Sequence, residues 1–438
     1  MNFEIKTLFL CVFVVFISPS ILFAQGVQKI SLQQAIDLGI KSSSNLKIAA
    51  AKRIMATADV REAKDKQLPS AAVSASYLRL SSANVDLKTR SGSGGGGSPN
   101  VNQALYGILN VSLPLYAAGK IKYGIESATF LEKAAVLNGE NDKEAVIYNA
   151  ISAYTNLYKA DKTVGVIKEN LNTSVQRDSL FSRLEQNGIV ARNDLLKAQL
   201  TTSNIELTLL DAENNLTVAN INMALLLGLP ENTIIEVDSN FVNNNITLKP
   251  FLEMEALAMQ NRKDIQSLSF QKKAAGTAVK IAKSDAYPTV ALTGGYIAAD
   301  IPNLITITNA VNIGVGVQYN IASLWKNNTK LTQARAKETQ LTATEALLND
   351  GIKLQLNKDY QNYLLAQKKI EVYEKSIIQA TENYRITKNK YDNSLVSITD
   401  LLDADVALLQ TKLNSTVAKA DAALAYNKLL STIGTLSK

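Results

Sequence analysis

The sequence contains no histidine, a single cysteine (Cys11) and only eight prolines in 438 residues. Because Cys11 lies within a predicted leader, the rest of the chain has neither a thiol nor an imidazole side chain. This absence excludes the usual zinc sites, a Ser-His-Asp triad, a cysteine nucleophile and a disulfide scaffold. We therefore predict that the protein is not an enzyme and that it holds no metal or cofactor.

Proline is both scarce and unevenly placed. Two long stretches, residues 115–229 and 303–438, contain none. Proline removes a backbone donor and clashes with the preceding helical turn, so stretches without it permit very long helices. The remaining prolines indicate where helices and strands begin or end.

Residues 1–24 resemble a secretory leader. Lys6 and the amino terminus supply positive charge, Leu8–Ile17 is an unbroken run of ten apolar residues, and Ala24 is a small residue before cleavage. Ten apolar residues are too few for the ~20 that a membrane-spanning helix needs. Cys11 lies in the middle of the run, so we do not predict a lipid attachment there.

Long hydrophobic runs are absent after the leader, where no segment offers 18 consecutive apolar residues. The remaining choices are a soluble exported protein or a β-barrel, whose strands give a weaker alternating signal. The formal net charge of +7 comes from interspersed lysines and acids. Interspersed charge is typical of solvated helix faces, and we predict no nucleic-acid partner.

An internal repeat organises the rest of the chain. Leu68–Ser70 resembles Tyr287–Thr289, 219 residues further along, and Asn193–Leu196 resembles Thr399–Leu402, 206 residues further along. Such self-similarity indicates that both halves share one structural plan. We predict a signal peptide at 1–24, a first repeat at 25–230, a connector at 231–249 and a second repeat at 250–438.

Each repeat is predicted to contain a medium helix, two strands, a very long helix and a second medium helix. The long helices, Gly119–Glu185 and Trp325–Tyr391, would each span roughly 100 Å. The medium helices Ser31–Gln67 and Asn193–Leu227 together match that length, and Pro250–Ala286 is the counterpart of the first. These lengths predict two hairpins, each with one continuous limb and one limb of two shorter helices.

Four segments show the alternation of β-strands. The clearest is Ile305–Ile321, for which we predict one continuous apolar face, and the others are Ala71–Leu80, Leu105–Tyr116 and Thr289–Ala299. Such alternation suits strands between lipid and water, although a soluble sheet with one face on a core gives the same pattern. Four strands cannot close a barrel and hydrocarbon excludes an open sheet edge, so membrane insertion would require several chains to share one barrel.

The order of the repeat, the strand junctions and the hairpin turns is similar to that of one known family. Proline follows Leu68 and Tyr287 at the junctions, Leu113–Gly119 closes the second strand, and the turns are Asn187–Leu195 and Asn393–Leu401. Over essentially the whole mature chain, this arrangement resembles the TolC family of outer membrane efflux channels.

The resemblance implies a mainly α-helical fold with a membrane β-barrel part. In a homotrimer, four strands per chain would form a twelve-stranded barrel, and the long helical hairpins would form a periplasmic tunnel. Such a channel is the passive exit duct of a tripartite efflux pump or a type I secretion system. A periplasmic adaptor would join it to the inner membrane transporter that supplies the energy. The expected location is the outer membrane, with contact to its lipid and with most of the chain in the periplasm.

The alternative interpretation is a periplasmic adaptor or a coiled-coil scaffold protein of an envelope complex, because these proteins also have long helical hairpins. An adaptor should show one hairpin flanked by compact β-domains. The present sequence instead contains two hairpins and about four strands, which favours the duct.

The resemblance also assigns residues to a pore entrance at the hairpin tips. Asp400 and Asp403 share one helix face, and acids at the matching family positions ring the narrow entrance and favour cations. Tyr391 and Asp194 align with positions around the closed entrance. The alternative is that the aspartates are ordinary first-turn acids after the Thr399 cap region, favoured by the helix dipole.

One departure from the family pattern concerns the link between neighbouring hairpins. Val396 stands where the best-studied pattern has an arginine, and Arg192 lies in the other tip instead. Apolar residues at a loop tip usually contact a partner, whereas the turns need glycine or a small polar residue for backbone reasons alone. The predicted adaptor contacts are Gly188, Ile189, Val190, Ser394, Leu395 and Val396.

Overall fold

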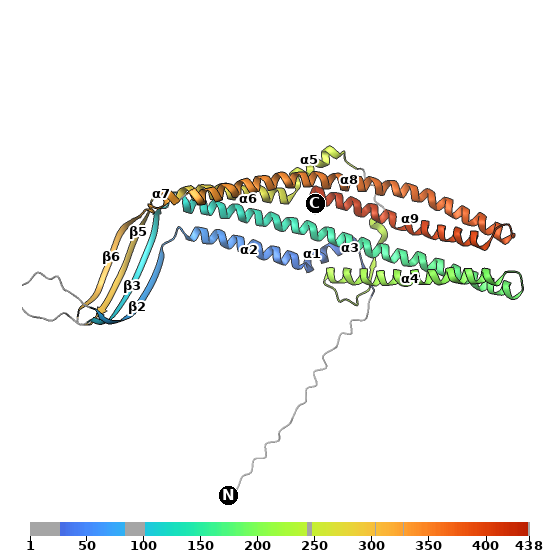
Figure 1. The fold of residues 1–438 in the computed structure, drawn as a ribbon, viewed down its shortest axis with the longest axis horizontal. Coiled ribbons are helices and arrows are strands. Elements are labelled where there is room, and N and C mark those ends of the chain that lie inside the picture. The colour runs from blue at the N-terminus through green and yellow to red at the C-terminus, as the bar shows by residue number, and fades with distance from the viewer. Residues whose placement is uncertain (1–26, 84–100, 243–247, 303, 327, 437–438) are drawn as a thin grey trace, which may run out of the picture.

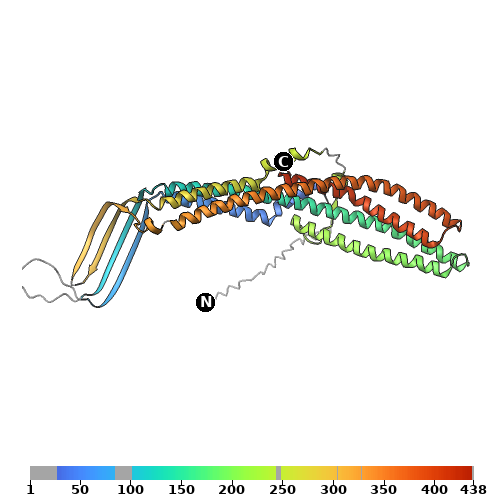
Figure 2. The same cartoon turned by 45° about the horizontal axis from the view of Figure 1, so that its top comes forward.

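The computed structural model shows an elongated rod with a sheet at one end and two helical turns at the other (Figures 1 and 2). The predicted leader lies outside the described residues. The structure describes residues 27–83, 101–242, 248–302, 304–326 and 328–436.

Two very long helices run along the rod, as the proline-free stretches predict. Helix α3, Lys120–Gln186, has 67 residues, and α8, Asn328–Asp392, has 65. Each folds back on a helix of 36 residues, α4 (Arg192–Leu227) after α3 and α9 (Ile398–Ile433) after α8. A rise of ~1.5 Å per residue makes the long helices about 100 Å long and the shorter ones about 54 Å long.

The first helix of each repeat is broken, which corrects the prediction of one continuous helix. At Ser43 and Arg262 the backbone leaves the helical region, with ψ angles of 116° and 124°. Ser43 restarts the helix by accepting a hydrogen bond from the Leu46 amide. The resulting helices are α1 (Leu32–Ser42), α2 (Ser44–Asp65), α5 (Phe251–Asn261) and α6 (Lys263–Ser284).

The helices form a wall that is largely one helix thick. Near the sheet, neighbouring helices pack in the order α2, α3, α6 and α8, and near the turns the order is α4, α3, α9 and α8. Helix α1 packs on α3 beside α4, so a broken limb and a continuous limb lie side by side, as predicted (Figure 1). Helix α3 is central in the wall, and α8 lies at one edge throughout.

The sheet at the end of the rod is antiparallel, with the strand order β2-β3-β5-β6. Its strands are β2 (Ser70–Ala83), β3 (Val101–Tyr116), β5 (Thr289–Ile301) and β6 (Ile305–Gln318). The short helix α7, Ser323–Lys326, connects β6 to α8. Strands β2 and β6 are the edges of this sheet.

The register places most of the large apolar side chains of the four strands on one face. Val73 pairs with Leu109, Leu109 with Tyr296, and Tyr296 with Val311. Val311 and Ile313 are 76% and 81% exposed, so no helix covers this face. The same face holds Tyr77, Leu105, Leu113, Leu292, Val315 and Val317, and the opposite face holds Ser70, Ser74, Ser76, Asn110, Ser112, Thr289, Thr293, Asn312 and Gln318.

A bulge in β6 corrects the prediction of one continuous apolar face. Ile297 pairs with Ala310 whereas Ala299 pairs with Ile307, so β6 has one extra residue between the two pairs. Asn309, in this interval, has a φ of 60°, and its amide donates to the Tyr296 hydroxyl over 3.2 Å. An extra residue reverses the side-chain alternation, so Ile307 lies on the polar face.

A compact hydrophobic core lies near the middle of the rod. Strands β1 (Gln28–Ile30) and β4 (Ile235–Val237) pair in parallel there, followed by the 3-10 helix η1 (Ser239–Val242). The buried Tyr154 hydroxyl donates to the Ile30 carbonyl over 2.9 Å and accepts from the Asp238 amide over 2.6 Å. Tyr154 thereby fixes both chain segments to α3.

Replacing Tyr154 by Phe should destabilise this core. The substitution leaves the Asp238 amide and the Ile30 carbonyl without that partner, which costs about 1–3 kcal/mol. Thermal unfolding of the detergent-solubilised protein should therefore begin at a lower temperature. Tyr158→Phe is the matched control, because Tyr158 also packs edge-on against Phe241 but has no hydrogen bond from its hydroxyl among the described residues. Equal melting of the two variants would contradict the assigned role.

Candidate functional site at the hairpin tips

Both hairpins turn through the same backbone geometry. Gly188 has a φ of 71° and Ser394 a φ of 60°, and the next amides, of Ile189 and Leu395, each donate back to the helix over 2.9 Å. A serine in the left-handed region is uncommon, and the turn imposes this conformation on it. The predicted tip residues thus occupy matching positions in the two repeats.

The aliphatic side chains at the tips differ in exposure. Ile189 and Leu395 are 69% and 73% exposed, whereas Val190 and Val396 are half-buried. Only the first two therefore offer most of their apolar surface to solvent in a single chain.

Behind the turns, an apolar cluster joins the two hairpins. Two of its aromatic residues, Phe181 and Tyr391, come from different hairpins, and their ring centroids are 5.7 Å apart. Its buried members are Phe181, Leu195, Ala198, Ile398, Leu401 and Leu402, with Leu184, Tyr384 and Tyr391 packed against them.

Two of the predicted entrance residues, Tyr391 and Asp194, influence each other electrostatically although they belong to different hairpins. Burial raises the pKa of Tyr391 above its ordinary value, and the negative charge of Asp194 raises it further. Tyr391 therefore stays neutral at physiological pH and can donate a hydrogen bond. Asp194 lies in the first turn of α4, 3.9 Å from the ammonium of Lys197, which donates to the Thr399 hydroxyl of the other hairpin over 3.5 Å.

Asp400 and Asp403 both lie on the exposed side of α9. Asp400 forms a capping box with Ser397, whose amide and hydroxyl donate to its carboxylate over 2.9 and 2.7 Å. Ser397, rather than the Thr399 of the sequence prediction, is therefore the cap. The Ser397 hydroxyl and amide hold the pKa of Asp400 below its ordinary value. Asp400 can cap the helix and still present negative charge to solvent, because only one of its carboxylate oxygens accepts these hydrogen bonds.

Arg192 does not connect the hairpins within this chain. Its guanidinium lies 3.5 Å from Glu185 of the same hairpin, and the Arg192 side chain is 69% exposed. Val396 contributes no charge at the corresponding point of the other tip. Within a single chain, neither residue therefore joins one hairpin to the other.

A buried ion pair that the sequence interpretation missed joins the hairpins instead. Arg177 of α3 lies 2.6 Å from Asp405 of α9, with side-chain exposures of 8% and 5%. Arg177 also donates to the Ser174 hydroxyl over 2.7 Å, and Asn170 donates to Asp405 over 3.4 Å. One sequence signal was present: Asp405 continues the spacing of the apolar residues at the start of α9 and so occupies a buried position.

The described residues contain no group of three or more carboxylates, thiols or imidazoles that could hold a metal ion. Among the described helices, none combines the length and apolar character needed to cross a membrane.

The structure has the tandem-repeat, mainly helical fold that is seen in solved outer membrane efflux channels. The sequence profile of the outer membrane efflux proteins matches residues 35–229 and 256–435. The chain therefore belongs to the outer membrane efflux protein family, which confirms the resemblance to TolC-like channels. This is a family of channel-type transport proteins of the outer membrane rather than of enzymes.

Solved structures show the same fold at low sequence identity. VceC of Vibrio cholerae matches with a TM-score of 0.77 and 19% identity over 92% of this chain and 96% of that chain. CmeC of Campylobacter jejuni matches with a TM-score of 0.76 and 19% identity over 92% of this chain and 86% of that chain. A membrane protein from Pseudomonas aeruginosa matches with a TM-score of 0.80 and 15% identity over 92% of each chain. No curated protein sequence matches.

Removing one member of the Arg177–Asp405 pair should loosen the junction of the hairpins. Arg177→Met or Asp405→Leu leaves a buried charge without its partner, which costs about 3–5 kcal/mol. The double variant removes both charges and should recover most of that loss. Thermal unfolding and limited proteolysis near the tips measure the effect. A double variant as unstable as the sum of the single variants would contradict a direct coupling.

Proposed function

We propose that three copies of this chain form a passive exit duct in the outer membrane. The energy would come from an inner membrane transporter joined through a periplasmic adaptor. The observation that carries this proposal is the pair of open edges that run along the whole molecule. One edge consists of β2, α2 and α4, and the other consists of β6 and α8.

Both edges expose apolar residues that a single chain leaves uncovered. Leu207 on α4 is 61% exposed, and Ile378 on α8 is 70% exposed. The exposed stripe of α4 contains Leu196, Leu200, Leu207, Leu210, Val218 and Leu225, and that of α8 contains Leu347, Leu354, Leu365, Val372, Ile378 and Ile386. Stripes of this length favour a helical partner over solvent.

The two edges belong to different elements, which favours a ring. When one surface binds a different surface of the next copy, the contact is head-to-tail and closes only at a fixed number of subunits. Pairing β6 of one chain with β2 of the next would leave no open strand edge in the closed ring. Three copies give twelve strands, an even number in the range of bacterial outer membrane barrels.

The apolar face of the sheet has the dimensions of a membrane band. From Val311 to Tyr319, β6 and the residue after it rise about 27 Å along the strand. A barrel tilt of about 40° would reduce this length to a height of about 21 Å, near the ~25 Å apolar band of outer membrane barrels. Exposed Tyr116 and Tyr319 lie at one end of this face, and exposed Tyr77 lies toward the other. Aromatic residues at both ends are typical of the two lipid interfaces.

The opposite end of the rod would be the periplasmic entrance. Asp194, Tyr391, Asp400 and Asp403 would line it, and a trimer would place six carboxylates of the α9 pair around the bore. Gly188, Ile189, Val190, Ser394, Leu395 and Val396 would contact the adaptor, and the exposure of Ile189 and Leu395 supports this role.

A cysteine cross-link should test the ring, because the chain beyond the leader has no cysteine. Leu207→Cys and Ile378→Cys place thiols on opposite edges, each about 22 Å from its tip by helical rise. The double variant treated with a bismaleimide should give a covalent trimer on denaturing gels. Either single variant should stay monomeric. Covalent dimers from a single variant would indicate a symmetric two-fold contact and contradict the proposal.

Neutralising the α9 acids should reduce cation selectivity. Channels reconstituted in planar bilayers are expected to prefer K⁺ to Cl⁻, and Asp400→Asn with Asp403→Asn should lower that ratio several-fold by removing negative charge from the bore. Asp211→Asn with Asp421→Asn is the control, because it removes the same charge further from the tip. An unchanged ratio in the tip variant would remove these residues from the entrance.

The pH dependence of that selectivity follows from the lowered pKa of Asp400. Because its pKa is depressed, Asp400 stays charged at pH values somewhat below the ordinary pKa of an aspartate. Its contribution to cation selectivity therefore persists there and is lost as the pH falls through the pKa of the folded protein. Ser397→Ala removes the hydroxyl that lowers the pKa, so the loss should move to higher pH.

A further inference from the structure

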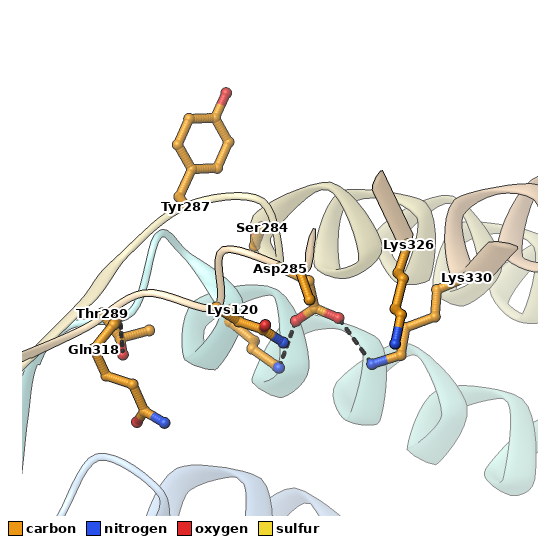
Figure 3. Close-up of a pocket in the computed structure, with 10 residues that line it drawn as sticks. Lys120, Ser284, Asp285, Tyr287, Thr289, Gln318, Lys326 and Lys330 are labelled. Atoms are coloured by element: carbon orange, nitrogen blue, oxygen red, sulfur yellow. Dashed lines mark hydrogen bonds and ion pairs between the residues drawn. The ribbon is translucent and has the colours of Figure 1, made fainter. Parts of the chain in front are cut away.

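A basic pocket lies where the sheet meets the helices, far from the tips (Figure 3). Its volume is about 340 Å³, and three lysines and one aspartate line it. Lys120 begins α3, Asp285 follows the last residue of α6, Lys326 ends α7, and Lys330 lies in the first turns of α8. Each charged side chain therefore comes from the start or the end region of a different helix.

Asp285 positions two of the three ammonium groups. It accepts from Lys120 over 2.6 Å and from Lys330 over 3.3 Å, and Figure 3 shows it between them. Partial burial opposes ionisation of Asp285, but the two lysines outweigh burial and hold its pKa below the ordinary value. The carboxylate is therefore charged at neutral pH and keeps both ammonium groups at the pocket wall.

The pocket retains positive charge and donor capacity after this pairing. Three lysines and one carboxylate leave a formal charge of +2. Each ammonium has three N–H donors, and Asp285 engages one from Lys120 and one from Lys330. The Lys326 ammonium has no hydrogen bond or ion pair to any residue that the structure describes. An incoming anion would therefore meet several unused donors.

The wall on the strand side identifies the face on which the pocket lies. Thr289 and Gln318 line it, and they pair with each other in the register of β5 and β6. Their side chains belong to the polar face of the sheet, opposite Val290 and Val317. In the proposed trimer this face would line the water-filled lumen.

We propose that this pocket is an oxyanion-binding site for phosphate-class groups of soluble ions or passing cargo. Its placement in the lumen rests on the proposed function, whereas its affinity for an oxyanion does not. Lysine ammonium groups form charge-assisted hydrogen bonds with phosphate oxygens, and Thr289 and Gln318 add neutral polar contacts. Three copies in a trimer would form a positive ring at the start of the helical tunnel, opposite in sign to the acids at the tips.

Inorganic phosphate is the probe for the first test. Titration of the full-length protein in neutral detergent at low ionic strength, followed by calorimetry, should show binding that Lys326→Gln with Lys330→Gln weakens at least tenfold. Lys337→Gln with Lys368→Gln is the control, because it removes two exposed lysines of the same helix α8 away from the pocket. Equal binding by all three proteins would overturn the proposal.

A second variant separates binding from folding. Lys326→Gln alone removes the lysine that has no described partner, so the Asp285 contacts to Lys120 and Lys330 remain. It should weaken phosphate binding several-fold without changing thermal unfolding. Undiminished binding by this variant would remove Lys326 from the site.

A lipid measurement distinguishes the two sources of a phosphate group. Native mass spectrometry with added phosphatidylglycerol should show the same lipid retention by the native protein and the Lys326→Gln, Lys330→Gln variant. Lipid retention that falls in the variant, with no response to inorganic phosphate, would overturn the assignment to a soluble anion. Failure of the cross-linking test would contradict the duct without affecting the calorimetric result, so the two proposals fail separately.

Discussion

The architecture depends on α3 remaining one uninterrupted helix. Five helices, α1, α2, α4, α6 and α9, pack directly against it, and Tyr154 near its middle fixes both β1 and the end of β4. Helix α8 is its counterpart in the second repeat and has nearly the same length, yet it lies at an edge and packs mainly on α6 and α9. The equivalent long helices of the two repeats thus have different roles, because α3 lies in the middle of the helical layer and α8 lies at its edge.

Charged contacts fix α3 to the second repeat near both of its ends. Lys120 contacts Asp285 beside the sheet, and Arg177 contacts Asp405 toward the tips, about 85 Å apart along the helix. Apolar faces with similar spacing can slide past each other by a turn or a heptad at modest cost. Displacing Arg177 from Asp405 would leave both charges buried and unpaired, so this contact selects one alignment of the hairpins. The Lys120–Asp285 pair at the other end is only partly buried, so it adds less energy but limits the same sliding.

The sequence was informative wherever a pattern extends over many residues. The long helices, the four strands and the tip turns lie within a few residues of their predicted positions, because proline-free length and period-two alternation determine them. Single-residue events were missed. Ser43 and Arg262 interrupt helices without a proline or glycine. Asn309 shifts the register of β6, and Arg177 pairs with Asp405, which lies more than 200 residues further along the chain. The Asn309 bulge and the Arg177–Asp405 pair involve contacts between distant segments that local propensity does not encode, whereas Ser43 caps α2 through a local contact.

The bulge at Asn309 has a consequence for how the sheet tolerates change in length. Beyond it, Thr306 rather than Ile307 continues the outer face, and its hydroxyl donates to Asp300 over 2.9 Å. The apolar face of β6 therefore ends at the bulge, within the strand, and not at the end of the strand. Residues could be added to or removed from the β5–β6 loop without altering the length of this apolar face, which in the proposed duct is the hydrophobic thickness to which a bilayer adjusts. In the proposed duct, the length of this loop could therefore change without changing the fit of the barrel to the membrane.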